Sequence, residues 1–180
     1  MEEEALEFAR NAHASQLRKY TGESYIEHPI RVATMVKTVP HTTEMVCAAY
    51  LHDVVEDTPV SLEDIQRKFG STVATLVDEL TDEFIKENYP DLNRKSRKER
   101  EVKRQANMSQ AAKTIKLADV VDNTRDIIEN DPDFARRYIP EMEALTEALQ
   151  GGEFKLLMRA CYQVQRGKLK LAEIRKRPVH

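Results

Sequence analysis

The sequence is poor in the residues that make tight turns, disulfide frameworks and membrane spans. Its 180 residues contain five glycines, seven prolines, two cysteines and no tryptophan. So few turn-forming residues leave long regular elements, which favours helices. Cys47 and Cys161 have neither a CxxC nor a zinc-like spacing, so we expect free thiols in a reducing compartment. The acidic residues 2–4 do not resemble a secretory leader, and no apolar run approaches membrane-spanning length, which predicts a cytoplasmic protein without a membrane partner.

The residues that are present are typical of a globular protein. Hydrophobic residues make up 41% of the chain and charged residues 33%. A chain of this length is expected to form one domain, over residues 1–180, with a sizeable core. The net charge of −3 gives no sign of a nucleic-acid partner.

Apolar residues recur at three- and four-residue intervals along most of the chain, which is the period of amphipathic helices. The pattern predicts a loop over 81–93 and helices over about 6–17, 28–40, 44–55, 61–70, 71–80, 94–105, 109–127, 132–149 and 152–166. No strand pattern competes with them. Residues 45–51 are apolar on every side, so their helix should lie at the centre of the protein. We predict an all-α fold, a compact bundle of about eight to ten helices.

A histidine and an aspartate, His52 and Asp53, stand at the end of this central helix. Burying an imidazole and a carboxylate together without partners is costly, and a metal ion is a partner that takes both. With His28 and Asp119 they make a set of two histidines and two aspartates, which suits Mn, Fe or Zn with positions open for water. The dipeptide alone leaves open a second interpretation, a hydrogen-bonded pair in the core.

Acidic residues continue along the helix from this pair. Asp53, Glu56 and Asp57 have the spacing i, i+3 and i+4 and share one helical face. Three acids on one face repel one another unless a cation neutralises them or one is protonated. The arrangement fits catalysis, with Asp53 on the metal and the other two acids orienting water and moving protons. A solvated acidic helix end is the alternative.

Two further patterns bear on a site. The helix over 109–127 carries a polar ladder with spacings of three, four and seven residues: Asp119, Asp122, Asn123 and Asp126. Residues 94–100 form the strongest basic run of the chain. That run predicts either an electropositive rim that attracts a polyanionic nucleotide or a solvated helix whose charge Glu99 and Glu101 offset.

Three motifs carry a resemblance to a known family. Residues 18–29, RKYTGESYIEHP, resemble the opening motif of the hydrolase domain of RelA/SpoT homologues, which are HD-domain metal-dependent phosphohydrolases. Residues 51–58, LHDVVEDT, resemble their HD-x-x-ED-T motif, and residues 116–119 their KLAD motif. The resemblance covers about residues 5–149 and leaves 150–180 as C-terminal helices. Since there is no room for a synthetase domain, the chain resembles a small stand-alone alarmone hydrolase.

The resemblance implies Mn²⁺-dependent hydrolysis of guanosine 3′,5′-bis(diphosphate) or the pentaphosphate to GDP or GTP and pyrophosphate. It places the metal on His28, His52, Asp53 and Asp119. It makes catalytic acids of Glu56 and Asp57, and substrate contacts of Arg18, Lys19, Asn123 and Tyr138. A guanine nucleotide is then the partner, and homo-oligomerisation is left open.

The sequence also departs from the family pattern in ways that concern the substrate. Ser24 replaces a usual proline, Val120-Val121 replaces a basic residue and leucine, and Asp126 stands where threonine can occur. Two alternatives therefore stay open, a phosphatase acting on another nucleotide such as NADPH and a catalytically silent nucleotide-binding protein.

Overall fold

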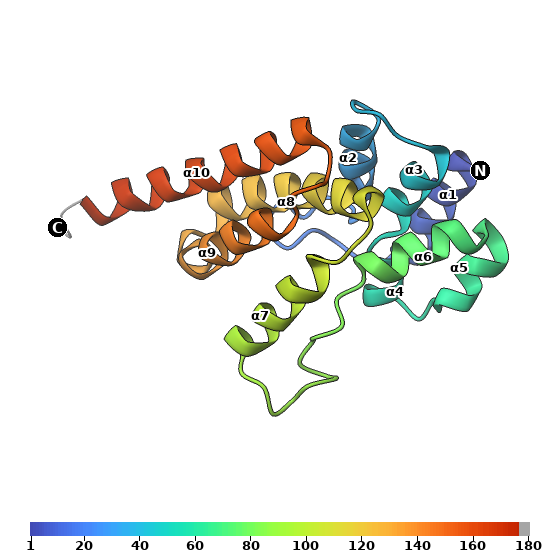
Figure 1. Ribbon diagram of the computed structural model, residues 1–180, viewed down its shortest axis with the longest axis horizontal. Helices are drawn as coiled ribbons and strands as arrows, with labels where there is room; N and C mark the ends of the chain where they lie inside the picture. The colour runs from blue at the N-terminus through green and yellow to red at the C-terminus, as the bar shows by residue number, and fades with distance from the viewer. Residues whose placement is uncertain (177–180) are drawn as a thin grey trace.

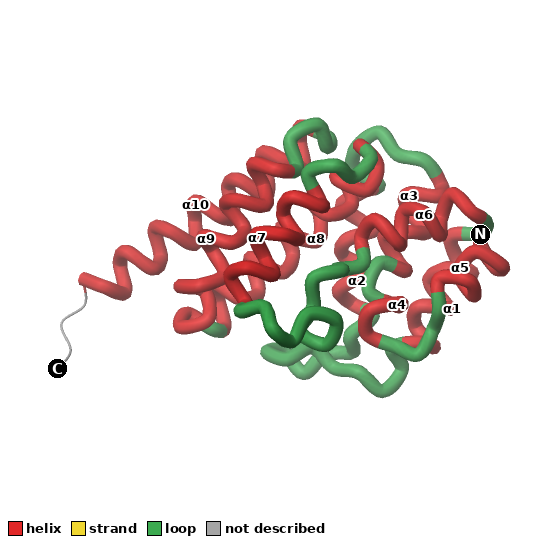
Figure 2. The backbone as a smooth tube through the Cα atoms, turned by 60° about the horizontal axis from the view of Figure 1, so that its bottom comes forward, coloured by secondary structure: helices red, strands yellow, loops and turns green. Residues whose placement is uncertain are grey.

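Ten helices make up the regular structure of residues 1–176, the part of the chain that this computed structural model describes (Figure 1). They are α1 (Glu2–Ala12), α2 (Glu27–Val36), α3 (Thr43–Leu51), α4 (Val54–Asp57), α5 (Leu62–Phe69), α6 (Ser71–Leu80), α7 (Arg94–Gln105), α8 (Gln110–Asn130), α9 (Pro132–Ala148) and α10 (Phe154–Lys176). Figure 2 shows helices and loops only, and one isolated bridge joins Leu17 to Ser24 among these residues. The predicted all-α fold is confirmed.

Short polar side chains begin several helices where the sequence predicts them. Thr42 and Ser109 each accept a hydrogen bond from the backbone N–H three residues further on. Ser61 and Asp64 form a reciprocal capping box at the start of α5. Gly70 ends α5 with a φ of 88°, which residues with a Cβ rarely adopt. These local signals fix the boundaries without help from the rest of the fold.

The first helix is shorter than predicted. α1 ends at Ala12, and Leu17, which was expected on its apolar face, lies in the following loop with 66% of its surface exposed. The turn is held by Gln16, whose amide hydrogen-bonds both the His13 ring (2.7 Å) and the distant carbonyl of Asp57 (2.8 Å). A long-range contact thus ends this helix.

The predicted helix over 44–55 is interrupted at residues 52 and 53. α3 ends at Leu51, and α4 begins at Val54. His52 Nδ1 hydrogen-bonds the carbonyl oxygen of Ala49 at 2.9 Å, so a side chain bonds to the last turn of α3. The His52-Asp53 pair therefore lies in a bend between two helices rather than within one.

The centre of the protein is formed by α3 and α8. All residues of α3 from Met45 to Leu51 are buried, as predicted, and α3 contacts α1, α2, α6 and α8. α8 in turn contacts α2, α6, α9 and α10, so it links the two ends of the molecule (Figure 1). The His52-Asp53 bend and the middle of α8 are thereby held close to each other.

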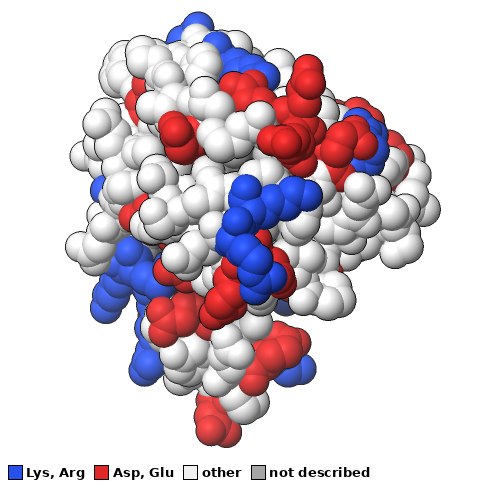
Figure 3. Space-filling view, turned by 90° about the vertical axis from the view of Figure 1, so that its right-hand side faces the viewer, with Lys and Arg blue, Asp and Glu red and all other residues white. Residues whose placement is uncertain are grey.

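Figure 3 shows how the charged side chains are distributed on one face of the molecule. Basic and acidic side chains lie interspersed there, with no broad area of one sign. In the described part of the chain, no helix has the length and apolar character needed to cross a bilayer.

Close packing of α10 gives a first prediction. A Cβ atom on Gly167 would lie 2.5 Å from Ile139 Cδ1 and 2.9 Å from Ile128 Cδ1. We expect Gly167→Val to lower the free energy of unfolding by about 1–3 kcal/mol, as overpacking does, measured by denaturant unfolding. Ala172→Val, at an exposed position of the same helix, introduces the same side chain outside the core and should cost less than about 0.7 kcal/mol, the loss of helix propensity from alanine to valine. Equal losses in both variants would contradict this account.

Candidate active site

Four of the predicted residues come together where α2, the α3–α4 bend and α8 meet. Ligand atoms of His28, His52 and Asp119 all lie within 4.8 Å of one another. Asp53 Oδ2 lies 3.1 Å from His52 Nε2 and 3.6 Å from His28 Nε2. The structure thus gathers all four side chains that the sequence predicted as metal ligands, from segments up to about 90 residues apart (28 to 119).

The free nitrogens of the two histidines fit a cation. Each Nδ1 is occupied, that of His28 by Asp122 Oδ2 at 2.8 Å and that of His52 by the carbonyl of Ala49. Each Nε2 is buried, has no hydrogen-bond partner among the described residues, and faces the carboxylate oxygens of Asp53 and Asp119. Since buried polar atoms rarely lack partners, a divalent cation between two imidazoles and two carboxylates would account for this arrangement.

The electrostatics of the cluster favour charge on every member. Burial lowers the pKa of His28, but Asp119 and Asp122 outweigh burial and raise that pKa to about 9. Burial raises the pKa of Asp53, yet the two histidines beside it lower that pKa further. A cation that binds here therefore takes the place of a proton on His28 Nε2.

Two charged residues beside the cluster were not assigned a role from the sequence. Lys116 Nζ lies 3.0 Å from Asp119 Oδ2, and Asp82 Oδ2 pairs with Lys98 at 2.9 Å. Burial lowers the pKa of Lys116, but Asp119 and Asp82 raise it more, so the lysine stays charged. Asp82 belongs to the loop after α6, whose position depends on the fold, so no local pattern could place it here.

Glu56 and Asp57 lie on α4, one turn beyond Asp53. Both side chains reach solvent, yet protein surrounds them closely enough to shift their pKa values. Partial burial and the charge of Asp82 raise the pKa of Glu56 to about 7, and its Oε2 accepts a hydrogen bond from the Asp82 N–H at 3.3 Å. Burial and the charge of Asp53 also raise the pKa of Asp57. A carboxyl group with a pKa near neutrality is suited to proton transfer.

The predicted substrate residues separate into two groups. Arg18 donates to Asn123 Oδ1 and Asp126 Oδ2, both at 3.0 Å, and only 10% of its side chain is exposed. Asn123 in turn donates to Asp119 Oδ1, which connects this pair to the cluster. Lys19 points elsewhere: its side chain is 75% exposed and its Nζ lies 3.4 Å from Asp131 Oδ2.

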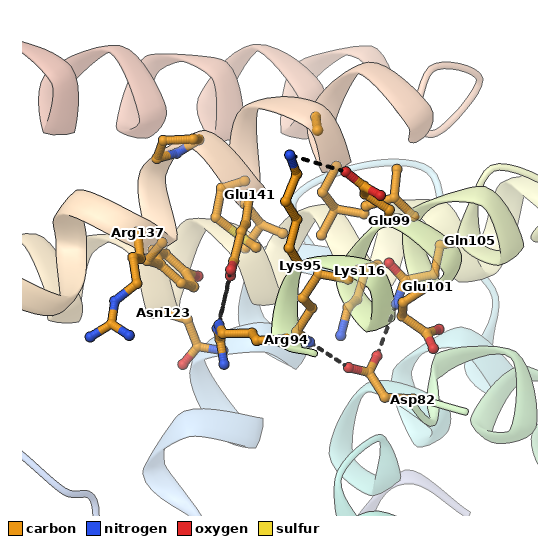
Figure 4. Close-up of a pocket in the computed structure, with 18 of the residues that line it drawn as sticks. Asp82, Arg94, Lys95, Glu99, Glu101, Gln105, Lys116, Asn123, Arg137 and Glu141 are labelled. Atoms are coloured by element: carbon orange, nitrogen blue, oxygen red, sulfur yellow. Dashed lines mark hydrogen bonds and ion pairs between the residues drawn. The ribbon is translucent and has the colours of Figure 1, made fainter. Parts of the chain in front are cut away.

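A cavity of about 850 Å³ extends from Asp119 and Asn123 between α7, α8 and α9. Tyr138 is buried in its wall. Figure 4 shows the basic side chains that line it, among them Arg94, Lys95, Lys116 and Arg137. Arg94 also makes two hydrogen bonds to Glu141 across the cavity, at 2.9 and 2.8 Å.

Arg94, Lys95 and Lys98 of the basic run line the cavity, which favours the first interpretation for these three residues. Acidic side chains nearby balance part of the positive charge of the run, as the second interpretation proposes. Lys95 pairs with Glu99 at 3.9 Å, and Lys98 pairs with Asp82. Glu101 is buried and accepts hydrogen bonds from the backbone N–H groups of residues 83 and 84, so it anchors the loop before α7.

An all-helical bundle with a His–Asp pair whose histidine is buried, a second histidine and a second aspartate has the features of the HD-domain hydrolases, and such a cluster suits a divalent cation. The sequence profile of the HD domain family matches residues 5–145. The chain belongs to this family.

Several relatives with a named activity are similar to this chain. A guanosine-3′,5′-bis(diphosphate) 3′-pyrophosphohydrolase, MESH1, from Drosophila melanogaster is 40% identical over 132 residues, which are 72% of this chain and 70% of that protein. An enzyme of the same description from Haemophilus influenzae is 37% identical over 139 residues, 74% of this chain but 20% of its own length. The solved structure of a metazoan ortholog of SpoT that hydrolyzes ppGpp superposes with a TM-score of 0.80 and 32% identity, over 92% of this chain and 94% of that one.

Proposed function

We propose that this protein hydrolyses guanosine 3′,5′-bis(diphosphate) and the corresponding pentaphosphate to GDP or GTP and pyrophosphate, with Mn²⁺ as the bound cation. The observation that carries the proposal is the pair of unpartnered histidine nitrogens, which face two carboxylates beside a cavity with basic walls. The activity of the MESH1 relatives supports the choice of substrate.

The four clustered side chains would hold the cation, and Glu56 and Asp57 would move the protons. His28, His52, Asp53 and Asp119 offer the ligand atoms. A divalent cation held there would make a bound water more acidic and would offset charge on phosphate oxygens. Glu56 takes the proton from the attacking water, because its pKa of about 7 lets it accept and release a proton near neutrality. That water forms a bond to the phosphorus next to the ribose 3′-oxygen, and the bond from this phosphorus to the 3′-oxygen breaks. Asp57, on the same turn and with a raised pKa, gives its proton to the 3′-oxygen, and the proton held by Glu56 replaces it.

The cavity supplies the contacts that a polyanionic nucleotide needs. Lys95 and Lys98 on α7 and Arg137 on α9 stand in its walls, where they attract phosphate groups. Asn123, at the end next to the cluster, is fixed by Arg18 and Asp119 and so presents its amide in one orientation. Arg18 contributes to the substrate site through its hydrogen bond to Asn123, which holds the amide of that residue in place.

We expect the purified protein to release pyrophosphate and GDP from guanosine tetraphosphate when Mn²⁺ is present. A chelator should abolish this activity, because Glu56 and Asp57 need the bound cation to activate water. Product chromatography measures both nucleotides. NADPH in the same panel tests the phosphatase alternative, which would yield phosphate and NADH. Tight binding of a nucleotide without turnover, in protein shown to be loaded with Mn²⁺, would contradict the proposed activity and favour a nucleotide-binding protein.

A further inference from the structure

One carboxylate lies directly behind the proposed cation site. Asp122 is on α8, and only 2% of its side chain is exposed. Its Oδ2 lies 2.8 Å from His28 Nδ1, on the side of the ring opposite the cluster. Its Oδ1 accepts from Arg31 Nε at 2.8 Å and from Arg125 Nη2 at 3.3 Å. Glu23 holds Arg31 from the far side, at 2.8 Å.

The two oxygens of Asp122 therefore have different partners, and every one of these partners requires Asp122 to accept a hydrogen bond. A carboxylate can only accept hydrogen bonds, so His28 Nδ1 must carry a proton and donate it. When the ring is neutral, that requirement leaves Nε2 without a proton and with its lone pair directed at Asp53 and Asp119. The hydrogen bond of one ring nitrogen sets the state of the other.

His52 reaches the same state by a different route. Its Nδ1 donates to the backbone carbonyl of Ala49, an acceptor that no side-chain substitution removes. The corresponding nitrogen of His28 instead hydrogen-bonds a side chain, that of Asp122. A backbone carbonyl thus orients the ring of His52, whereas a single side chain orients the ring of His28.

We propose that Asp122, held by Arg31 and Arg125, is a positioning residue that keeps the proton of His28 on Nδ1 and so makes Nε2 available to the cation. The inference rests on the proposed role of His28 as a metal ligand. Outer carboxylates of this kind commonly change metal affinity by about 10–100-fold.

Asparagine at this position provides a sharp test, because it has the shape of aspartate and only one oxygen. The arginines donate to that oxygen, so the amide nitrogen is turned towards His28 and donates to Nδ1. The ring must then carry its proton on Nε2 or lose the hydrogen bond, and either result opposes the cation. We expect Asp122→Asn to weaken Mn²⁺ binding at least as much as Asp122→Ala does, by about 10–100-fold or more.

A second set of variants separates this effect from simple loss of structure. In Asp122→Asn combined with Arg31→Ala and Arg125→Ala, the amide is free to rotate and offer its oxygen to His28. We expect this triple variant to bind Mn²⁺ about tenfold more tightly than Asp122→Asn alone. Glu129→Gln, about two turns further along α8 and also ion-paired, is the matched control and should stay within about twofold of the wild type.

The measurements are Mn²⁺ titration calorimetry and thermal unfolding of the metal-free proteins, and neither needs the substrate. A purely structural role predicts that affinity follows melting temperature, with the triple variant weakest. That order, or wild-type affinity in Asp122→Asn, overturns the inference while the metal site stands. If the wild type itself binds no Mn²⁺, the proposed metal site is wrong and the inference falls with it.

Discussion

Replacing Asp53 with alanine is expected to abolish Mn²⁺ binding and hydrolysis together. Oδ2 of Asp53 is 3.1 Å from His52 Nε2 and 3.6 Å from His28 Nε2, so it completes the set of atoms that face the cluster. Without it, Asp119 is the one carboxylate left to balance a divalent cation between two imidazoles. We expect the affinity for Mn²⁺ to fall by more than about a hundred-fold, beyond the usual effect of an outer partner, and product formation to fall to background.

The fold should survive this change, because Asp53 stands at the start of α4 without using its side chain as a cap. Asp53→Asn keeps an oxygen for the hydroxyl of Tyr25, which donates to Asp53 at 2.7 Å, and should lose the metal as well. Asp78→Ala, at an exposed position of α6, is the control. Calorimetric titration that shows wild-type Mn²⁺ affinity in Asp53→Ala would remove this residue from the ligand set.

The helical fold was predictable because its signals are local, whereas the four cluster residues were proposed from motifs that resemble those of a known family. Helix periodicity and caps act over three or four residues, and the limits predicted for α7 agree with the structure. The break at His52 had no signal in the apolar spacing, which continues through it, although His52 Nδ1 hydrogen-bonds the carbonyl of Ala49 three residues earlier. On either side of this break, His52 and Asp53 both lie against His28.

The surroundings of the cluster depend on pairs that lie far apart in the chain. Arg18 meets Asp126 across 108 residues, and Arg94 meets Glu141 across 47. Lys19 follows Arg18 directly and was assigned the same role, yet the structure turns it to the surface beside Asp131. Which side of a loop a charged residue faces is decided by these distant partners, so spacing alone does not reveal it.

Replacing Glu56 with glutamine is expected to separate metal binding from catalysis. Glutamine keeps an oxygen that can accept the hydrogen bond from the Asp82 N–H, so the loop after α6 and the fold should be unaffected. It has no carboxylate to take a proton, and loss of a general base commonly costs about 10²–10⁴-fold in rate. We expect kcat to fall by that amount while calorimetry gives a Mn²⁺ affinity within about threefold of the wild type.

The pH dependence distinguishes a base from a merely acidic neighbour. A general base must be unprotonated, and partial burial with the charge of Asp82 raises the pKa of Glu56 to about 7. Wild-type activity should therefore fall as the pH decreases through the neutral range, whereas the residual activity of Glu56→Gln should lack that fall. Glu63→Gln, an exposed acid on α5, should keep the wild-type profile. Full activity of Glu56→Gln loaded with Mn²⁺ would contradict the assignment of Glu56 as the base. It would indicate that Asp57, the other acid on this turn with a raised pKa, accepts the proton.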